Sequence, residues 1–207
     1  MTQWCAKRAS AVVVMSAEMD RHLDADAAVI PHGVDLDQFR PRNQAAARAE
    51  LGWADDTVSV LFPAHPARPV KNYPRAERVV AAARDRLSDP VSLETLSDVP
   101  HQAVETYMNA ADALLLTSHH EGSPNTVKEA LACNLPVVST PVGDVADRLD
   151  GVSPSAVCET DDELVGALTR VLRERTRSNG RGAVRELTPE RMARRLRAVY
   201  DDACSDG

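Results

Sequence analysis

The sequence predicts an α/β protein built on a doubly wound, Rossmann-like parallel sheet, and three observations support this fold class. Short apolar runs alternate along the chain with longer segments of helical periodicity, which is the element order of doubly wound folds. Several of the short runs are apolar at every position, as expected for strands covered by helices on both faces. Apolar residues make up 43% of the 207 residues, which is enough to form a buried core.

Strands and helices can be assigned in order along the chain. The short runs with the composition of buried strands are 11–15, 58–62, 91–96, 113–117, 136–139 and 156–158. The segments with apolar residues at helical spacing are 76–87, 102–111, 126–133, 161–173 and 189–203. The basic run 170–185 is expected to be a solvated helix face followed by a loop. Because ligands of doubly wound sheets bind outside the carboxyl ends of the strands, a site is expected in the turns that follow them.

The first thirty residues resemble the end of another domain. Residues 5–23 have the pattern of a helix end, a strand and a second helix capped by Ser16. A strand and helix so close to Met1 would have few neighbours in a self-contained domain. We therefore expect 1–30 to be the remnant of an N-terminal domain and 31–207 to form the main domain.

Charge and composition argue against several functions. The chain has 24 Lys and Arg residues against 31 Asp and Glu, and the resulting net charge of -7 argues against binding to nucleic acid or to anionic membranes. Aromatic residues, at 3%, are too few for base-stacking platforms. The four cysteines show no Cys-x-x-Cys pair, which favours a reducing compartment over a disulfide scaffold or zinc site. The run 11–15 is too short for a signal sequence or membrane span, so a soluble, cytoplasmic protein is expected.

The most informative stretch runs from Ser118 to Glu129, between a predicted strand and a predicted helix. The sequence contains no Gly-x-Gly-x-x-Gly after a strand, no P-loop motif and no Gly-x-Ser-x-Gly motif. Ser123 is the expected N-cap and Pro124 the first helical residue. The free N–H groups and the dipole of the helix start favour an anion, and Gly122 lets a ligand approach the backbone closely.

Two carboxylates, eight positions apart, belong to this stretch. Glu121 lies in the loop and Glu129 on the helix, where Asn125 shares its face. Carboxylates accept hydrogen bonds from vicinal hydroxyls, so the pair suits a sugar or a ribose beside a phosphate site. The alternative is that both are ordinary exposed surface residues.

Two further turns are candidate ligand sites. Gly143 follows the strand 136–139 and can adopt a positive φ that exposes N–H groups. The loop after strand 58–62 carries His65, Arg68 and Lys71, and its cations suit a diphosphate. An ordinary turn and a basic surface loop are the respective alternatives. Of the three lysines in the chain, Lys71 and Lys128 both fall in these candidate turns.

No metal site is expected. The pairs Asp24-x-Asp26 and Asp35-x-Asp37 imitate a metal-binding Asp-x-Asp motif, but neither ends a core strand. The adjacent histidines His119 and His120 point their rings apart and make a poor chelate.

Taken together, these motifs resemble glycosyltransferase family 4, retaining enzymes of the GT-B fold. The segment 29–35, followed by Phe39–Pro41, is similar to the interdomain Asn-Gly-Val-Asp…Phe-x-Pro motif of the family, with His32 in place of Asn. Residues 110–129 match its Glu-x7-Glu element, and 130–143 continue it. The resemblance extends from about residue 11 to the C-terminus and implies the C-terminal, nucleotide-sugar-binding half of such an enzyme.

The resemblance also implies roles for individual residues. Glu129 would bind the ribose hydroxyls of the donor nucleotide, and Glu121 would hold the transferred sugar. The backbone of Gly122, Ser123, Pro124 and Asn125 would assist at the sugar and phosphate, as would Gly143. Lys71 matches the diphosphate lysine of the family. Val99, within the segment Ser97–Pro100, would help to contact the base through backbone groups.

One position departs from the family pattern. The family usually has Gly-Arg at the end of the preceding strand, five or six residues before the lysine, where this chain has His65 and Pro66. We assign the second cation to Arg68 instead, which requires a rearranged loop. The sequence after Glu121 is Gly-Ser-Pro-Asn where Gly-Phe-Gly is common, so the sugar contact is expected to differ as well.

The implied reaction transfers a sugar from a nucleotide-sugar to an acceptor hydroxyl with retention. Arg68, Lys71 and helix amides would stabilise the leaving diphosphate, and no metal or cofactor is expected. The acceptor would be a glycan, a lipid or a small molecule. UDP, GDP and ADP all remain open as the nucleotide.

The acceptor-binding domain would be a missing N-terminal domain or a partner chain, through which alone peripheral membrane association is expected. Helix 189–203 would cross back to that domain, leaving the apolar residues Met192, Leu196 and Val199 exposed. One alternative is a nucleotide-sugar-binding module without turnover. Another is an unrelated doubly wound domain such as a flavodoxin-like regulator.

Overall fold

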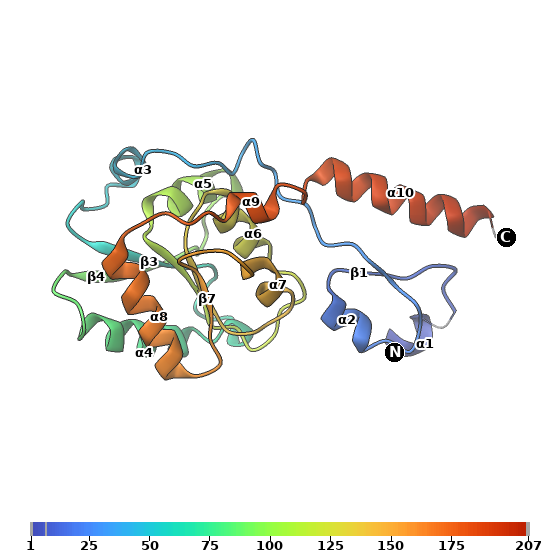
Figure 1. Ribbon diagram of the computed structural model, residues 1–207, viewed down its shortest axis with the longest axis horizontal. Helices are drawn as coiled ribbons and strands as arrows, with labels where there is room; N and C mark the ends of the chain where they lie inside the picture. Colours follow the sequence, from blue (N-terminus) through green and yellow to red (C-terminus); the bar gives the residue numbers. More distant parts are fainter. Residues whose placement is uncertain (1, 7, 206–207) are drawn as a thin grey trace.

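The computed structural model describes residues 2–6 and 8–205 and contains the predicted parallel sheet (Figure 1). The strands run in the order β4-β3-β5-β6-β7, and every pairing is parallel. Their bounds are β3 Val58–Phe62, β4 Val91–Thr95, β5 Ala113–Leu116, β6 Val137–Ser139 and β7 Ala156–Val157. The predicted strands after residue 57 are thus confirmed to within one or two residues. Met1, Lys7, Asp206 and Gly207, at or near the ends of the predicted domains, lie outside the described residues.

Helices cover the sheet on both faces, which is why its strands are apolar throughout. On one face, Ala113 and Leu115 pack with α4 (Tyr73–Arg84) and α8 (Asp161–Glu174). On the other, Leu114 and Leu116 pack in a second cluster with residues of four helices. These helices are α5 His101–Ala110, α6 Asn125–Ala132, α7 Val145–Leu149 and α9 Arg181–Val184. The sheet is therefore the middle layer of a three-layer body.

The helix α3 (Gln44–Leu51) is an element that the hydrophobic pattern does not predict. Asn43 caps its start by accepting a hydrogen bond from Ala46 N at 2.9 Å, and Gly52 ends it with a φ of 69°. The helix packs against α5, and only Ala47 and Arg48 are buried. An alanine-rich segment has little apolar periodicity, so its caps were the usable signal.

The described residues before 31, which we call the N-terminal part, form a second, smaller sheet. Strand β1 (Val13–Val14) pairs in parallel with β2 (Ala28–Val29), and neither joins the five-stranded sheet. Helices α1 (Thr2–Ala6) and α2 (Ala17–Arg21) flank β1 in the sequence. The expected cap is confirmed, since the Ser16 hydroxyl accepts a hydrogen bond from Met19 N at 3.2 Å. That this part is the remnant of a larger domain stays a prediction.

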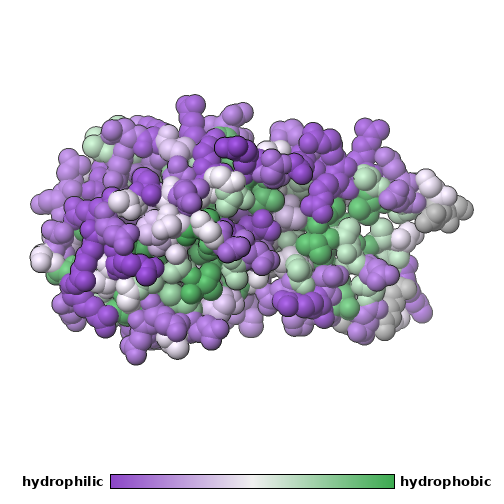
Figure 2. All heavy atoms as spheres, viewed as in Figure 1, coloured by the Kyte–Doolittle hydropathy of each residue, from purple (hydrophilic) through white to green (hydrophobic). Residues whose placement is uncertain are grey.

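The terminal helix α10 (Pro189–Ser205) leaves the main body, residues 31–188, and lies beside the N-terminal part (Figure 1). Arg195 Nη2 donates to Val29 O at 2.8 Å, which ties the two together. The expectation of an exposed apolar face is wrong: its three residues, Met192, Leu196 and Val199, are half-buried. Figure 2 shows apolar side chains gathered where α10 meets the β1 region. Among the described residues, no helix has the length and apolar character that a membrane span requires.

Two connecting segments run together between the main body and the N-terminal part. Val34 N donates to Leu187 O at 2.7 Å, and a Cβ on Gly33 would lie 2.5 Å from Pro189 N. No side chain fits at that distance, so glycine is required at position 33 by close backbone approach. The two chain crossings therefore form one packed junction.

The expectation of a solvated basic run at 170–185 is wrong for two of its arginines. Arg181 donates to the carbonyls of Leu36, Phe39 and Ala132 at 2.7–2.8 Å. Arg177 donates to the carbonyls of Met108 and Asn109, in the last turn of α5. Carbonyls at helix ends lack intrahelical partners and favour cations, which explains why these side chains turn inward.

Candidate functional site

The candidate site lies where the strand order of the sheet reverses. The chain leaves β3 toward β4 on one side and then crosses to β5 on the other. At such a switch point, the loops after the two central strands separate and leave a crevice at their carboxyl ends. Those loops are residues 63–72 after β3 and 117–124 after β5, which include two of the turns singled out from the sequence.

The structure brings together Lys71 and Glu121, which are fifty positions apart in the sequence. Lys71 Nζ lies 2.5 Å from Glu121 Oε1, and both side chains are largely buried. The Ser118 hydroxyl donates to the same carboxylate oxygen at 2.7 Å. The pair is therefore a preformed, partly desolvated site that combines a cation with a hydroxyl acceptor.

Backbone contacts hold the two loops in register beneath this pair. Lys71 ends a short 3₁₀ helix, η1 (Pro69–Lys71), and Asn72 follows with a φ of 54°. The Thr117 hydroxyl contacts the carbonyl oxygens of Lys71 and Asn72 at 3.2 and 3.0 Å, and His119 N donates to Val70 O at 2.9 Å. These bonds fix the position from which the Lys71 side chain extends.

The second carboxylate, Glu129, lies on α6 and has a partner that the sequence analysis missed. Its Oε1 is 3.2 Å from His101 Nε2, at the start of α5. Burial raises the pKa of the Glu129 carboxyl, and the contact with His101 opposes that shift. The signal that could have revealed His101 is its place directly after the segment Ser97–Pro100, already assigned to the base.

The expected N-cap role of Ser123 is wrong. Helix α6 begins at Asn125 with Pro124 as its N-cap, and no side chain caps it. The Ser123 hydroxyl instead donates to Asp144 Oδ2 at 2.8 Å and accepts from Lys128 Nζ at 3.0 Å. Residues distant in the sequence thus compete successfully for the hydroxyl that local geometry assigns to the helix end.

Lys128 is the centre of this buried network and was noted from the sequence only as a lysine in a candidate turn. Its side chain is fully buried, and its Nζ also donates to His32 O at 3.0 Å. Burial lowers the pKa of Lys128 to about 8, although the charge of Asp144 opposes the shift. The other Asp144 oxygen, Oδ1, is buried without a hydrogen-bond partner in the described part of the chain. The network links the junction at residue 32 to the loop after β5.

Gly143 packs directly on this loop. It has a φ of 56°, and a Cβ there would lie 2.4 Å from Gly122 O. Both the conformation and the space therefore require glycine. Gly122 in turn faces the N-terminal part, since a Cβ on it would meet Met19 Sδ at 3.1 Å and Met15 Cε at 3.3 Å.

Other residues assigned from the sequence lie around the site without joining the Lys71–Glu121 pair. Arg68 is exposed, and its guanidinium makes no hydrogen bond or ion pair within residues 2–6 and 8–205. Val99 is half-buried, and its side chain packs against the core. Asn125 is exposed at the start of α6. No group of three or more His, Cys, Asp or Glu residues in the described chain is placed to hold a metal ion.

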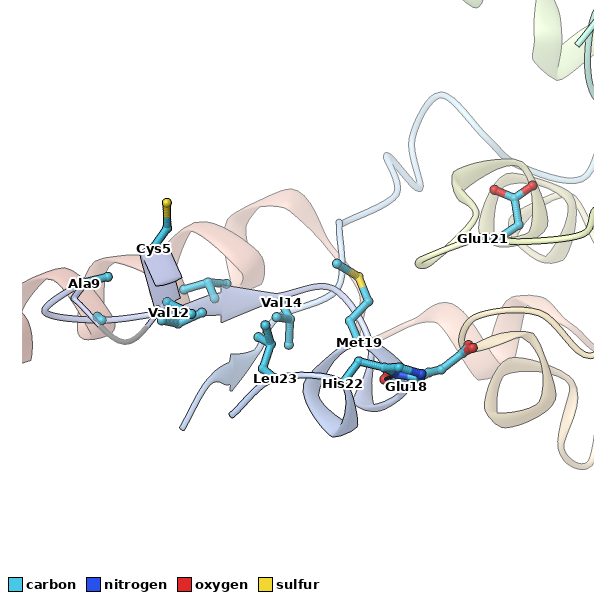
Figure 3. A pocket seen from close by; sticks show the side chains of 12 residues that line it. Cys5, Ala9, Val12, Val14, Glu18, Met19, His22, Leu23 and Glu121 are labelled. Atoms are coloured by element: carbon cyan, nitrogen blue, oxygen red, sulfur yellow. Dashed lines mark hydrogen bonds between the residues drawn. The ribbon is translucent and has the colours of Figure 1, made fainter. Parts of the chain in front are cut away.

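A hollow of about 670 Å³ separates the loop after β5 from the N-terminal part (Figure 3). Glu121 reaches its edge from the main body, and its other lining residues lie within 5–23. Most of these are apolar, including Val12, Val14 and Leu23. The polar edge at Glu121 thus adjoins an apolar surface contributed by another part of the chain.

Comparisons with known proteins connect this geometry to one family. Residues 70–174 match the family model described as glycosyl transferases group 1. A D-inositol 3-phosphate glycosyltransferase of Geodermatophilus obscurus is 31% identical over 215 residues, covering 86% of this chain and 48% of that protein. A 2-deoxystreptamine N-acetyl-D-glucosaminyltransferase of Streptomyces fradiae is 35% identical over 94 residues, covering 42% of this chain and 22% of that protein.

Solved structures show the same fold at low sequence identity. Sucrose-phosphate synthase from Thermosynechococcus elongatus matches with a TM-score of 0.84 and 20% identity, covering 100% of this chain and 61% of that one. Anabaena Alr3699/HepE, solved in complex with UDP-glucose, matches with a TM-score of 0.74 and 16% identity, covering 95% and 66%. With 48% of the Geodermatophilus protein covered, the chain spans about half the length of that curated relative.

Proposed function

The chain belongs to the family of group 1 glycosyl transferases, and from this premise we propose that it supplies the nucleotide-sugar-binding half of a retaining glycosyltransferase. The predicted resemblance and fold class, the Rossmann-like C-terminal half of a GT-B enzyme, are confirmed. The observation that carries the proposal is the Lys71–Glu121 pair at the strand-order switch point, on the same loop and helix as the buried Glu129.

The proposed reaction assigns a task to each member of the pair. When the donor binds, the diphosphate takes Lys71 as its counter-ion, and Glu121 becomes free to accept hydrogen bonds from the transferred sugar. The bond between the anomeric carbon and the diphosphate oxygen breaks with its electron pair on the diphosphate. The acceptor oxygen forms the new bond on the same face of the sugar, and its proton passes to the departing diphosphate. Lys71 stabilises the charge that develops there.

The remaining assigned residues complete the proposed donor site. Glu129 binds the ribose, and Val99 contacts the base through its backbone. The backbone around the turns at 122–125 and 143 approaches the sugar and phosphates. Arg68 is the second diphosphate cation, and its exposed side chain has to turn toward Lys71 when the donor binds. No metal or cofactor takes part in this proposal.

We further propose that residues 1–30 belong to the acceptor-binding side of the whole enzyme. The separate two-stranded sheet and the apolar hollow beside Glu121 support this, because both belong to a surface on which further structure can pack. The names of the two curated relatives add cyclitols to the acceptors that deserve testing. All four cysteines are unpaired, which supports the proposed cytoplasmic location.

A second candidate function is a nucleotide-sugar-binding module without turnover. It is favoured by one observation, that the chain covers only 48% of the Geodermatophilus relative. Detectable transfer or hydrolysis of a nucleotide-sugar by the isolated chain would rule it out.

Calorimetric titration of the purified chain with UDP, GDP and ADP tests the donor site. We expect saturable binding of one nucleotide and a loss of at least about tenfold in affinity in Glu129→Ala, since a buried hydrogen-bonding carboxylate is removed. Glu174→Ala, at the exposed end of α8, is the matched control and should bind normally. Absence of binding by the unaltered chain to all three nucleotides at millimolar concentration would contradict the proposal.

A further inference from the structure

His101 is held in one orientation by groups on two sides. Its ring packs edge-on against the buried Phe39, with the ring centroids 5.5 Å apart at 69°. Its backbone carbonyl accepts a hydrogen bond from Gln38 Nε2 at 3.2 Å. The free edge of the ring then directs Nε2 at Glu129 Oε1, 3.2 Å away. The imidazole is therefore an oriented group rather than a loose surface side chain.

Burial is unequal across this contact. The side chain of Glu129 is 10% exposed, whereas that of His101 is 64% exposed. Among the described residues, His101 is the one side chain that hydrogen bonds the Glu129 carboxylate. A buried carboxylate is costly unless its oxygens are bonded, and a single exposed partner compensates it poorly. The arrangement suits a carboxylate that completes its hydrogen bonds with a ligand.

A hydroxyl group fits between these two residues better than other ligand groups do. A hydroxyl both donates and accepts, so one inserted here donates to Glu129 Oε1 while it accepts from His101 Nε2. A phosphate oxygen would meet the carboxylate with like charge, and an apolar atom would leave both groups unpaired. A neighbouring hydroxyl of the same ligand can donate to Glu129 Oε2. The site therefore matches a vicinal diol.

We propose that His101 is a donor-site residue that, together with Glu129, binds the ribose diol of the nucleotide. This rests on the proposed function, because the diol belongs to the donor of that reaction. The position agrees with it, since His101 follows Ser97–Pro100, the segment assigned to the base, while Glu129 shares α6 and its preceding loop with the diphosphate and sugar residues. On binding, one ribose hydroxyl replaces the direct contact between the imidazole and the carboxylate.

A purely structural role makes a different prediction. If His101 only completed an ion pair or packed on Phe39, its effect on binding would not depend on which ribose hydroxyls the nucleotide carries. His101→Phe keeps an aromatic ring for the contact with Phe39 and removes the hydrogen-bond donor. His101→Gln places an amide nitrogen near the position of Nε2 and is the conservative variant expected to restore binding.

The test is calorimetric titration of the full chain and both variants with the nucleotide that the unaltered chain binds and with its 2′-deoxy and 3′-deoxy analogues. We expect His101→Phe to weaken binding of the ribonucleotide roughly tenfold, the size of one hydrogen bond to a charged or polar group. For the analogue that lacks the hydroxyl contacting His101, the same substitution should change affinity less than about twofold, as a double-mutant cycle requires. His101→Gln should remain within about threefold of the unaltered chain.

Three results would overturn the proposal. The first is unchanged ribonucleotide affinity in His101→Phe. The second is an equal loss for the ribonucleotide and both deoxy analogues, which would assign His101 a structural role. The third is failure of His101→Gln to restore binding while its thermal unfolding matches that of the unaltered chain. If the unaltered chain binds no nucleotide, the proposed function itself fails, and this inference with it.

Discussion

The main body and the N-terminal part of this chain differ in how their polar groups are satisfied. In the main body, buried charged side chains such as Lys128 and Asp144 hydrogen bond across loops that are distant in sequence. In the N-terminal part and α10, the helices α2 and α10 contain no fully buried residue, and the printed link between them is a single exposed bond from Arg195. The difference shows that the main body carries its own stabilising network, whereas the N-terminal part depends on a small half-buried interface.

The largest expected effect comes from disturbing the contact between Gly143 and Gly122. In Gly143→Ala, the new Cβ meets backbone rather than a flexible side chain, so we expect a loss of about 3 kcal/mol in the free energy of unfolding. Gly151→Ala is the matched control, because Gly151 has a similar φ of 68° with nothing within 4 Å of the added atom. It should lose only about 1 kcal/mol. Urea denaturation measures both, and equal losses would show that the clash is relieved by local movement.

A pair of arginine substitutions compares the two regions directly. Arg181→Ala removes bonds to three carbonyls within the main body, and we expect a loss of about 2 kcal/mol in the free energy of unfolding. Arg195→Ala removes one exposed bond between α10 and Val29, and we expect a loss of about 0.5 kcal/mol or less. Urea denaturation followed by circular dichroism measures both. A larger loss in Arg195→Ala would reverse the comparison.

The smallest expected effect is a pH dependence that belongs to Lys128. Its pKa falls from 10.5 to about 8 in the folded protein, so the unfolded chain binds more protons between these values. Stability from this group therefore rises as pH increases from about 8 to 10.5, by an amount on the order of 1–2 kcal/mol. Below pH 8 the full cost of burying the charged amine is present.

Comparison with Lys128→Met isolates this contribution. Burial raises the pKa of the Cys133 thiol to about 12, so that group contributes in the opposite direction as pH rises. The Cys133 contribution is common to both proteins and cancels in their difference. Urea denaturation at pH 7, 8, 9 and 10 should show the unaltered chain gaining stability relative to Lys128→Met. A pH-independent difference would contradict the assignment.

The elements that sequence patterns predicted well are those whose partners did not matter. The strand 58–62 was recovered residue for residue, because a run buried on both faces is apolar whatever lies beside it. The cap at Ser16 was also predicted correctly, since it depends on three consecutive residues. By contrast, α3 and the inward-facing Arg177 and Arg181 were missed, because their places depend on helix ends that come from other parts of the chain.

The candidate site divides in the same way. The Glu-x7-Glu spacing and Lys71 were identified from the sequence, since each belongs to a local turn with its own pattern. The expected cap at Ser123 was wrong because Asp144 and Lys128, remote in the sequence, hold its hydroxyl. His101 was missed for the same reason, since nothing near it in the sequence indicates a partner twenty-eight positions away.

By itself, therefore, the sequence determined the fold class, the family resemblance and the loops in which ligand-binding residues lie, because periodicity and turn chemistry are local properties. Only the tertiary structure decided which of those residues meet. It placed Lys71 on Glu121, His101 on Glu129 and Lys128 on Ser123, and it left Arg68 exposed. Such pairings depend on strand order and loop packing, which bring together groups that the chain separates by up to fifty residues.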